Sequence, residues 1–155
     1  MLLLALHRPG DLAPLLEAGV LDRLLFFDDV QRAAFDALAE ADELHEAIAA
    51  ASPEVAVMIT ELAVSEPPPD SEPAEQTVLG LARHAAERAR SRAEAEARLA
   101  EQDADSARLA RANTSTTLLQ DLLALLNDPI AAGAAAREAA QRLVASLQQQ
   151  SLEEA

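Results

Sequence analysis

The most regular feature of the first 66 residues is a series of short apolar stripes with helical spacing. Apolar side chains that recur at i, i+3, i+4 and i+7 lie on one face of a helix. No stretch alternates apolar and polar residues convincingly, as a half-buried strand does. The pattern therefore predicts an all-α fold that begins with a small multi-helix bundle. The two clearest stripes are Leu44, Ala47, Ile48 and Ala51, and Val55, Met58, Ile59 and Leu62.

Polar residues at regular intervals indicate where these helices begin. Asp28 is followed three residues later by Gln31, which is the pattern of a capping box. Asp11 and Asp42 precede two further apolar stripes and are predicted N-caps of the same kind. Ser52 stands before Pro53, and proline favours the first position of a helix. The bundle is thus expected to contain several short, separately capped helices.

A Pro-rich segment at 67–74 separates this bundle from the rest of the chain. Proline blocks helix formation and favours an extended backbone, so the segment predicts a linker. After it, 75–102 reads as one uninterrupted helix with many Arg and Glu residues at i, i+4 spacing. A helical hairpin is expected to follow, up to residue 150. The predicted domains are therefore the 1–66 bundle, the 67–74 linker and the 75–150 long helix with its hairpin.

The turn that opens the hairpin has two candidate positions. Asp103-Ala104-Asp105-Ser106 is one break in the helical pattern, and Asn113 to Thr117 is the other. The residue pattern leaves both open. Asp128-Pro129 predicts the start of a last helix, and the residues from Gln148 onward are expected to fray.

The net negative charge of the chain bears on whether its partner is a nucleic acid or a protein. The chain carries 27 acidic residues against 12 basic ones, and all of the basic ones are Arg, so the formal net charge is −15. Residues 1–75 hold 16 of the acids and three Arg. Such a surface repels phosphate backbones, which argues against direct nucleic-acid binding and leaves room for a basic protein partner.

The start of the chain is apolar but too short to span a membrane, and it lacks the basic region of a signal peptide. An apolar helix that begins so abruptly is expected of a fragment of a longer chain. No Cys is present, which excludes disulfides and zinc–thiolate sites. A cytoplasmic protein without a membrane partner is expected.

The residues that could carry chemistry do not form a recognisable site. His7, His45 and His84 fall in different predicted helices without metal-ligand spacing, and the glycines are isolated. Asp28-Asp29 is best explained by helix capping, and Asp103-Ala104-Asp105 follows a helix rather than a strand. The prediction is a non-catalytic domain with no metal and no cofactor.

Leucines near the end of the chain are the candidate partner-binding residues. They cover a broader apolar face than a hairpin seam needs. Packing of the hairpin against itself is one explanation, and contact with another protein's helices is the other. The two are compatible. The candidates are Leu118, Leu119, Leu122, Leu123, Leu126, Leu143 and Leu147.

Three sequence blocks resemble a known family in their order. The first is the leucine run before His7-Arg8-Pro9, and the second is the aromatic pair Phe26-Phe27 before a capped helix with Arg32, Phe35 and Leu38. The third is Leu62-Ala63-Val64-Ser65-Glu66. A long charged helix and a Leu-rich helix complete the order. Over roughly residues 1–126 this order is similar to the C-terminal, helicase-binding domain of the bacterial replicative DNA primase of the DnaG type.

The resemblance implies a helix bundle joined by a long helix to a helical hairpin. It also implies a partner, the N-terminal domains of the hexameric replicative DNA helicase, and a role in recruiting RNA primer synthesis to the replication fork. In the family the terminal hairpin makes much of this contact, and the nearest positions here are Leu118 to Leu126. The family's zinc-binding and polymerase domains lie outside such a region.

Two other interpretations stay open. The N-terminal domain of the replicative helicase itself resembles the primase bundle in fold, although the long Arg/Glu helix after a Pro-rich segment favours the primase. A free-standing helical scaffold or adaptor would also be compatible with residues 75–150. The apolar repeats there are not sustained as heptads, which argues against a coiled coil.

Overall fold

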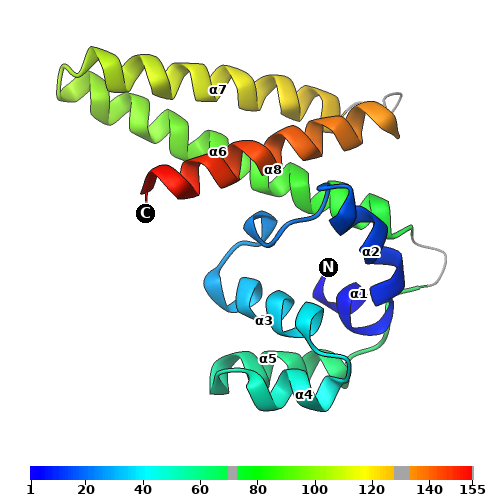
Figure 1. Ribbon diagram of the computed structural model, residues 1–155. Helices are drawn as coiled ribbons and strands as arrows, with labels where there is room; N and C mark the ends of the chain where they lie inside the picture. The colour runs from blue at the N-terminus through cyan, green and yellow to red at the C-terminus, as the bar shows by residue number, and fades with distance from the viewer. Residues whose placement is uncertain (70–72, 128–132, 155) are drawn as a thin grey trace. The chain divides into compact units, whose positions relative to one another are not determined.

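In the computed structural model, which describes residues 1–69, 73–127 and 133–154, every regular element is a helix. The predicted all-α class is confirmed. The chain consists of two compact units, Met1–Leu81 and Ala82–Ala155. The elements, drawn in Figure 1, are α1 (Leu2–His7), α2 (Pro9–Glu17), the 3₁₀ helix η1 (Arg23–Leu25), α3 (Asp29–Glu40), α4 (Leu44–Ala50), α5 (Pro53–Ala63), α6 (Ala74–Gln102), α7 (Ser106–Asn127) and α8 (Ala134–Glu154).

The first unit is a bundle built around α3, which packs against α1, α4, α5 and η1. Its core contains Ala34, Ala47, Val55 and Ile59, each from one of the predicted stripes or from α3. Small alanines on α3 and α4 let the helices approach closely, and Ile59 fills the space between them. At the edge of the bundle, the rings of Phe26 and Phe35 lie 4.9 Å apart between centroids.

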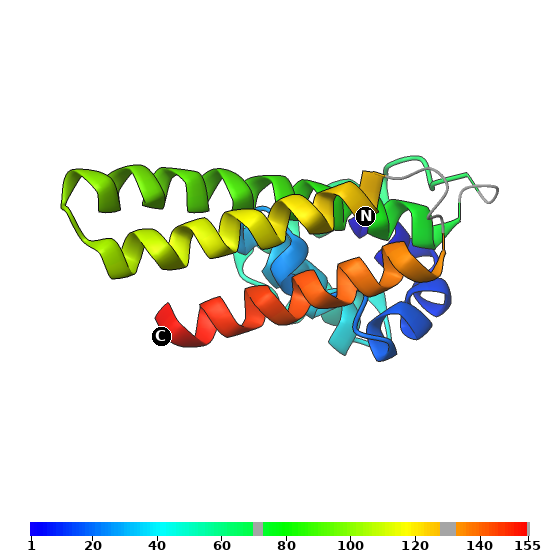
Figure 2. The same ribbon diagram turned by 90° about the horizontal axis from the view of Figure 1, so that it is seen from above.

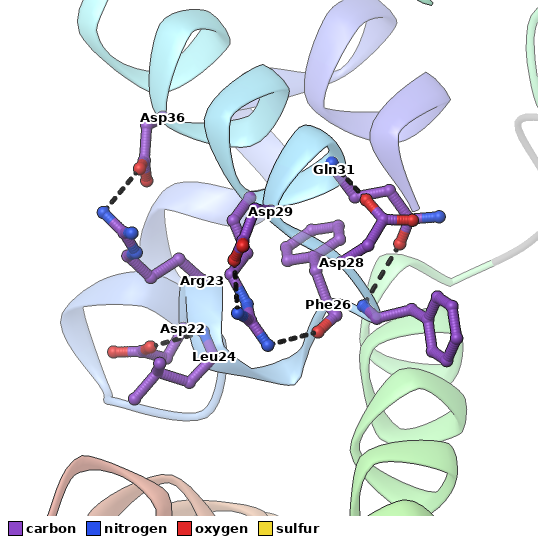
Figure 3. A network of polar contacts seen from close by, with 10 residues as sticks. Asp22, Arg23, Leu24, Phe26, Asp28, Asp29, Gln31 and Asp36 are labelled. Carbon is purple, nitrogen blue, oxygen red and sulfur yellow. Dashed lines mark hydrogen bonds and ion pairs between the residues drawn. The ribbon is translucent and has the colours of Figure 1, made fainter. Parts of the chain in front are cut away.

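The predicted N-cap at the start of α3 is confirmed, although the reciprocal bond of a capping box reaches one residue further back, to Phe27 (Figure 3). The Asp28 carboxylate accepts a hydrogen bond of 2.8 Å from the backbone N–H of Gln31. The Gln31 side chain in turn accepts one of 3.2 Å from the N–H of Phe27. Asp22 caps η1 in the same way, accepting from the N–H of Leu24 at 2.8 Å. Two consecutive caps fix the path of the chain between η1 and α3.

Two other predicted caps are wrong. The helix α2 already begins at Pro9, so Asp11 lies within its first turn and accepts a hydrogen bond of 2.6 Å from the Arg8 guanidinium instead. The helix α4 begins one residue later than expected, with Glu43 at the N-cap position and no side-chain capping bond. Asp42 therefore stands outside the helix. At α2 the start is set locally, because Pro9 occupies the first helical position, which proline favours.

The division between the units does not follow the proline segment. Ala74 already belongs to α6, and both Ala74 and Val78 are buried, so the first turns of this helix are part of the first unit. The boundary lies after Leu81, inside the helix. The predicted 67–74 linker includes residues 70–72, which lie outside the described residues.

The second unit consists of the remainder of α6, α7 and α8. Figures 1 and 2 show α6 and α7 side by side and antiparallel, joined by a tight turn, with α8 running antiparallel to α7. The turn is the first of the two candidate breaks: α6 ends at Gln102, α7 begins at Ser106, and Ala104 takes the left-handed conformation with φ +53°. Asp105 caps α7 by accepting from the N–H of Arg108 at 2.9 Å.

The second candidate break, residues 113–117, lies in the middle of α7. The hydroxyls of Thr114, Thr116 and Thr117 donate to the carbonyls four residues earlier, at 2.9, 2.9 and 3.1 Å. These bonds satisfy the hydroxyl groups within the helix, so the polar run does not interrupt it.

The last helix is longer than expected. Its predicted start at Asp128-Pro129 lies outside the described residues, but α8 continues to Glu154, beyond the expected fraying point at Gln148. Ala136, Ala140 and Leu143 are buried and form an apolar line along this helix.

Candidate partner-binding surfaces

Four of the seven predicted partner-binding leucines are structural. Leu119, Leu122, Leu123 and Leu143 are buried, and Leu122 and Leu143 have no exposed surface. They belong to α7 and α8, which pack against each other. For these residues, packing within the hairpin accounts for the breadth of the leucine face without any partner.

The other three predicted residues remain partly accessible. Leu118, Leu126 and Leu147 are each half-buried. Leu118 lies seven residues from Leu125, so the two side chains share one flank of α7, two turns apart. Leu125 is 36% exposed. We call Leu118 and Leu125 the α7 flank; together with Leu126 they are the accessible leucines between residues 118 and 126.

Leu147 lies on the packed face of α8 but is covered incompletely. Six of the seven leucines of α7 lie between residues 118 and 126, and the exception is Leu109. The apolar surface of α7 is therefore concentrated in its second half.

The turn between α6 and α7 is held by charged groups. The Arg108 guanidinium forms an ion pair with Glu96 of α6 and donates a hydrogen bond of 3.1 Å to Asp103. The hydrogen bond from Arg108 lowers the pKa of Glu96 below its ordinary value, and the positive charges of Arg108 and Arg111 add to this effect. The same contact with Glu96 raises the pKa of Arg108. Asp103 and Asp105 thus stabilise the turn by accepting hydrogen bonds from Arg108.

The remaining chemical candidates are dispersed. His7, His45 and His84 lie in α1, α4 and α6, and the latter two pair locally with Glu43 and Glu87 at 3.1 and 3.2 Å. Within the part of the chain that the structure describes, no three His, Asp or Glu side chains gather as a metal site would require.

Sequence reasoning missed the three most exposed of the five large apolar residues that the first unit presents to solvent. Phe27, Val57 and Val64 are 62%, 57% and 84% exposed. The signal was present for Val57, because it falls outside the stripe formed by Val55, Met58, Ile59 and Leu62. Figure 3 shows Phe26 and Asp28, which flank Phe27 in the chain, within the polar network around η1 and α3.

Comparison of the chain with protein-family models, curated proteins and solved structures gave no match. Among the described helices, none combines the length and apolar character needed to cross a bilayer.

Proposed function

We propose that this chain is a non-catalytic interaction domain that binds the hexameric replicative helicase, as the C-terminal domain of a bacterial DNA primase does. The observation that carries the proposal is the order of the elements. A bundle of short helices leads into the 29-residue helix α6, which continues into a unit with two more helices, α7 and α8. This is the arrangement that the sequence resemblance implies, and it accompanies the three sequence blocks of the first unit.

The charges favour a protein partner. The first unit, Met1–Leu81, holds 16 acidic residues and three Arg, a net charge of −13. A surface of this sign is unsuited to phosphate backbones, so we expect the domain to reach the replication fork through the helicase rather than through DNA.

The α7 flank is the proposed contact. Helix-in-groove recognition uses apolar side chains at i, i+3, i+4 and i+7, and Leu118 and Leu125 have the last of these spacings. The buried leucines next to them, Leu119 and Leu122, keep α7 in place against α8. Their role in binding is therefore indirect.

The test is a pull-down of the cognate hexameric helicase with purified chain. Replacing Leu118 and Leu125 together with Asp is expected to lower the retained helicase at least about tenfold, because two apolar anchors become charged. The matched control replaces Thr117 and Ala124 together with Asp, which adds the same two charges at exposed positions of α7 with the same seven-residue spacing. Leu122→Asp is not a suitable probe, because that side chain is fully buried and its substitution disrupts the hairpin itself.

Helical content of each variant is checked by circular dichroism before binding is compared. If the Leu118/Leu125 double variant retains as much helicase as the unmodified chain, the α7 flank is not the interface. Failure of the unmodified chain to retain helicase, together with self-association through residues 75–150, would favour the scaffold interpretation.

A further inference from the structure

The outer face of α5 carries apolar residues that nothing in the first unit covers. Val55 and Ile59 point into the core of the bundle, whereas Val57 and Val64 lie about opposite to them around the helix axis. Val64 is the C-cap residue of α5 and keeps a right-handed helical backbone, so the two outer valines, seven residues apart, follow one line along the helix. Single exposed apolar residues are ordinary on protein surfaces, but two in line on a short helix form a strip.

This strip borders a shallow open depression lined by Ala56, Val57, Thr60, Glu61 and Val64. The Thr60 hydroxyl donates to the Ala56 carbonyl at 2.7 Å, so its proton is already engaged within the helix. The lining is consequently apolar except at one edge, which Glu61 supplies. We call this set of five residues the α5 strip.

The charge around the α5 strip is of one sign. Residues 33–82 contain eleven Asp and Glu and neither Arg nor Lys. The three Arg of the first unit lie earlier in the chain, where Arg8, Arg23 and Arg32 pair with Asp11, Asp36 and Asp29 at 2.6, 2.7 and 2.8 Å. On α5 itself, Glu54 and Glu61 form no ion pair among the described residues. An apolar line is thus bordered by carboxylates that no cation of the unit neutralises.

We propose that the α5 strip is a docking site for a basic amphipathic helix of a partner protein. Apolar side chains of that helix would cover Val57 and Val64, and its Arg or Lys residues would reach Glu54 and Glu61. The negative charge around the α5 strip favours a basic helix over the other possible occupants. A second copy would bring the same carboxylates against each other, and phosphate-rich nucleic acid or an anionic bilayer would be repelled in the same way. This site is separate from the α7 flank and does not depend on helicase binding.

The probe is a synthetic, fluorescently labelled helical peptide of about 18 residues, a length at which an amphipathic helix begins to be stable. It carries Leu at i, i+3, i+4 and i+7 and Arg on the flanking positions. The control peptide has the same composition with its Leu residues spread around the helix. Binding to the full chain is followed by fluorescence anisotropy and by amide shifts in ¹H–¹⁵N NMR spectra.

The amphipathic peptide is expected to bind more tightly than the control and to shift the amides of 56–64. Replacing Val57 and Val64 together with Ser is expected to weaken binding at least about tenfold, since both apolar contacts are lost. Glu61→Arg is expected to weaken it further by removing an attractive charge and adding a repulsive one. The matched controls are Phe27→Ser, an exposed apolar residue elsewhere in the unit, and Glu17→Arg, an exposed acid on α2. Both should bind as the unmodified chain does.

Three outcomes would overturn the proposal. Equal binding of both peptides would show attraction by charge alone. Shifts that map to another face, or unchanged affinity of the Val57/Val64 double variant, would move the site elsewhere. Concentration-dependent dimerisation that this double variant abolishes, without any peptide binding, would assign the strip to a second copy instead.

Discussion

Individual carboxylates decide where several helices of this protein begin. Asp22, Asp28 and Asp105 each accept a hydrogen bond of 2.8 or 2.9 Å from a backbone N–H in the first turn that follows. These N–H groups have no partner within the helix, so each cap satisfies a donor that would otherwise rely on water. The caps hold the connections around η1 and α3 and the turn between α6 and α7.

The cap at Asp28 is expected to contribute measurably to stability. Replacing Asp28 with Ala should lower the free energy of unfolding by about 1 kcal/mol, because the Gln31 N–H loses its acceptor. Urea denaturation followed by circular dichroism measures the change. Asp42→Ala is the control, since Asp42 is exposed and stands outside α4, and its effect should stay within about 0.5 kcal/mol. Equal losses for the two variants would contradict the assignment of the cap.

The ion pair between Glu96 and Arg108 predicts a shifted titration. Because Arg108 donates to its carboxylate, the pKa of Glu96 lies below its ordinary value. A lowered pKa means that the pair stabilises the turn above the pKa of an unfolded glutamate, and that this stabilisation is lost as the pH falls through the folded pKa. In Arg108→Gln, the pKa of Glu96 should return toward the ordinary range. Carboxyl ¹³C shifts followed through an acid titration measure it.

The control for this titration is Arg90→Gln, because Arg90 pairs with Glu94 at 3.4 Å rather than with Glu96. The titration of Glu96 should be unchanged in that variant. A Glu96 pKa that is ordinary in the unmodified chain would mean that the pair does not form in solution.

At the scale of elements, the sequence predicts the helices better than the turns between them. Apolar spacing and the Asp28 cap located α3 and α5, because both signals are local. The turn after α6 stayed undecided between two polar segments. Helix propensity alone cannot separate them, since the threonines at 114–117 bond to their own helix while Asp105 caps the next one.

The position of this turn predicts opposite effects for two glycine substitutions. Ala104 has φ +53°, a conformation that costs an alanine more than a glycine. Ala104→Gly should therefore raise the free energy of unfolding by about 0.5 to 1 kcal/mol. Ala110→Gly, at an exposed position inside α7, should lower it by about 1 kcal/mol. Chemical denaturation measures both. Destabilisation by Ala104→Gly would indicate a continuous helix at that point.

Helical spacing in the sequence also could not separate buried from accessible leucines on α7. The spacing indicates which leucines share a face of the helix, but whether another helix covers that face depends on residues elsewhere in the chain. The sequence therefore identified Leu119 and Leu122 as apolar and co-facial without revealing that α7 and α8 bury them. Leu118 and Leu125, at the edge of that face, keep the exposure that a partner requires.

Across the whole molecule, charge is distributed unequally between the units. Met1–Leu81 carries a net −13, and Ala82–Ala155 carries −2, with eleven acids against nine Arg. The acidic unit presents the α5 strip, and the nearly neutral unit presents the α7 flank. Two surfaces of different electrostatic character are suited to two different partners, and salt is expected to weaken binding at the first more than at the second.

The central claim is that this chain binds a replicative helicase without catalysing a reaction of its own. The most direct measurement is a calorimetric titration of the folded chain into the intact cognate helicase hexamer. We expect a saturable isotherm for the unmodified chain and binding at least about tenfold weaker when Leu118 and Leu125 are both replaced with Asp. Absence of saturable heat at two temperatures, with the chain and the hexamer also separating on gel filtration, would contradict it.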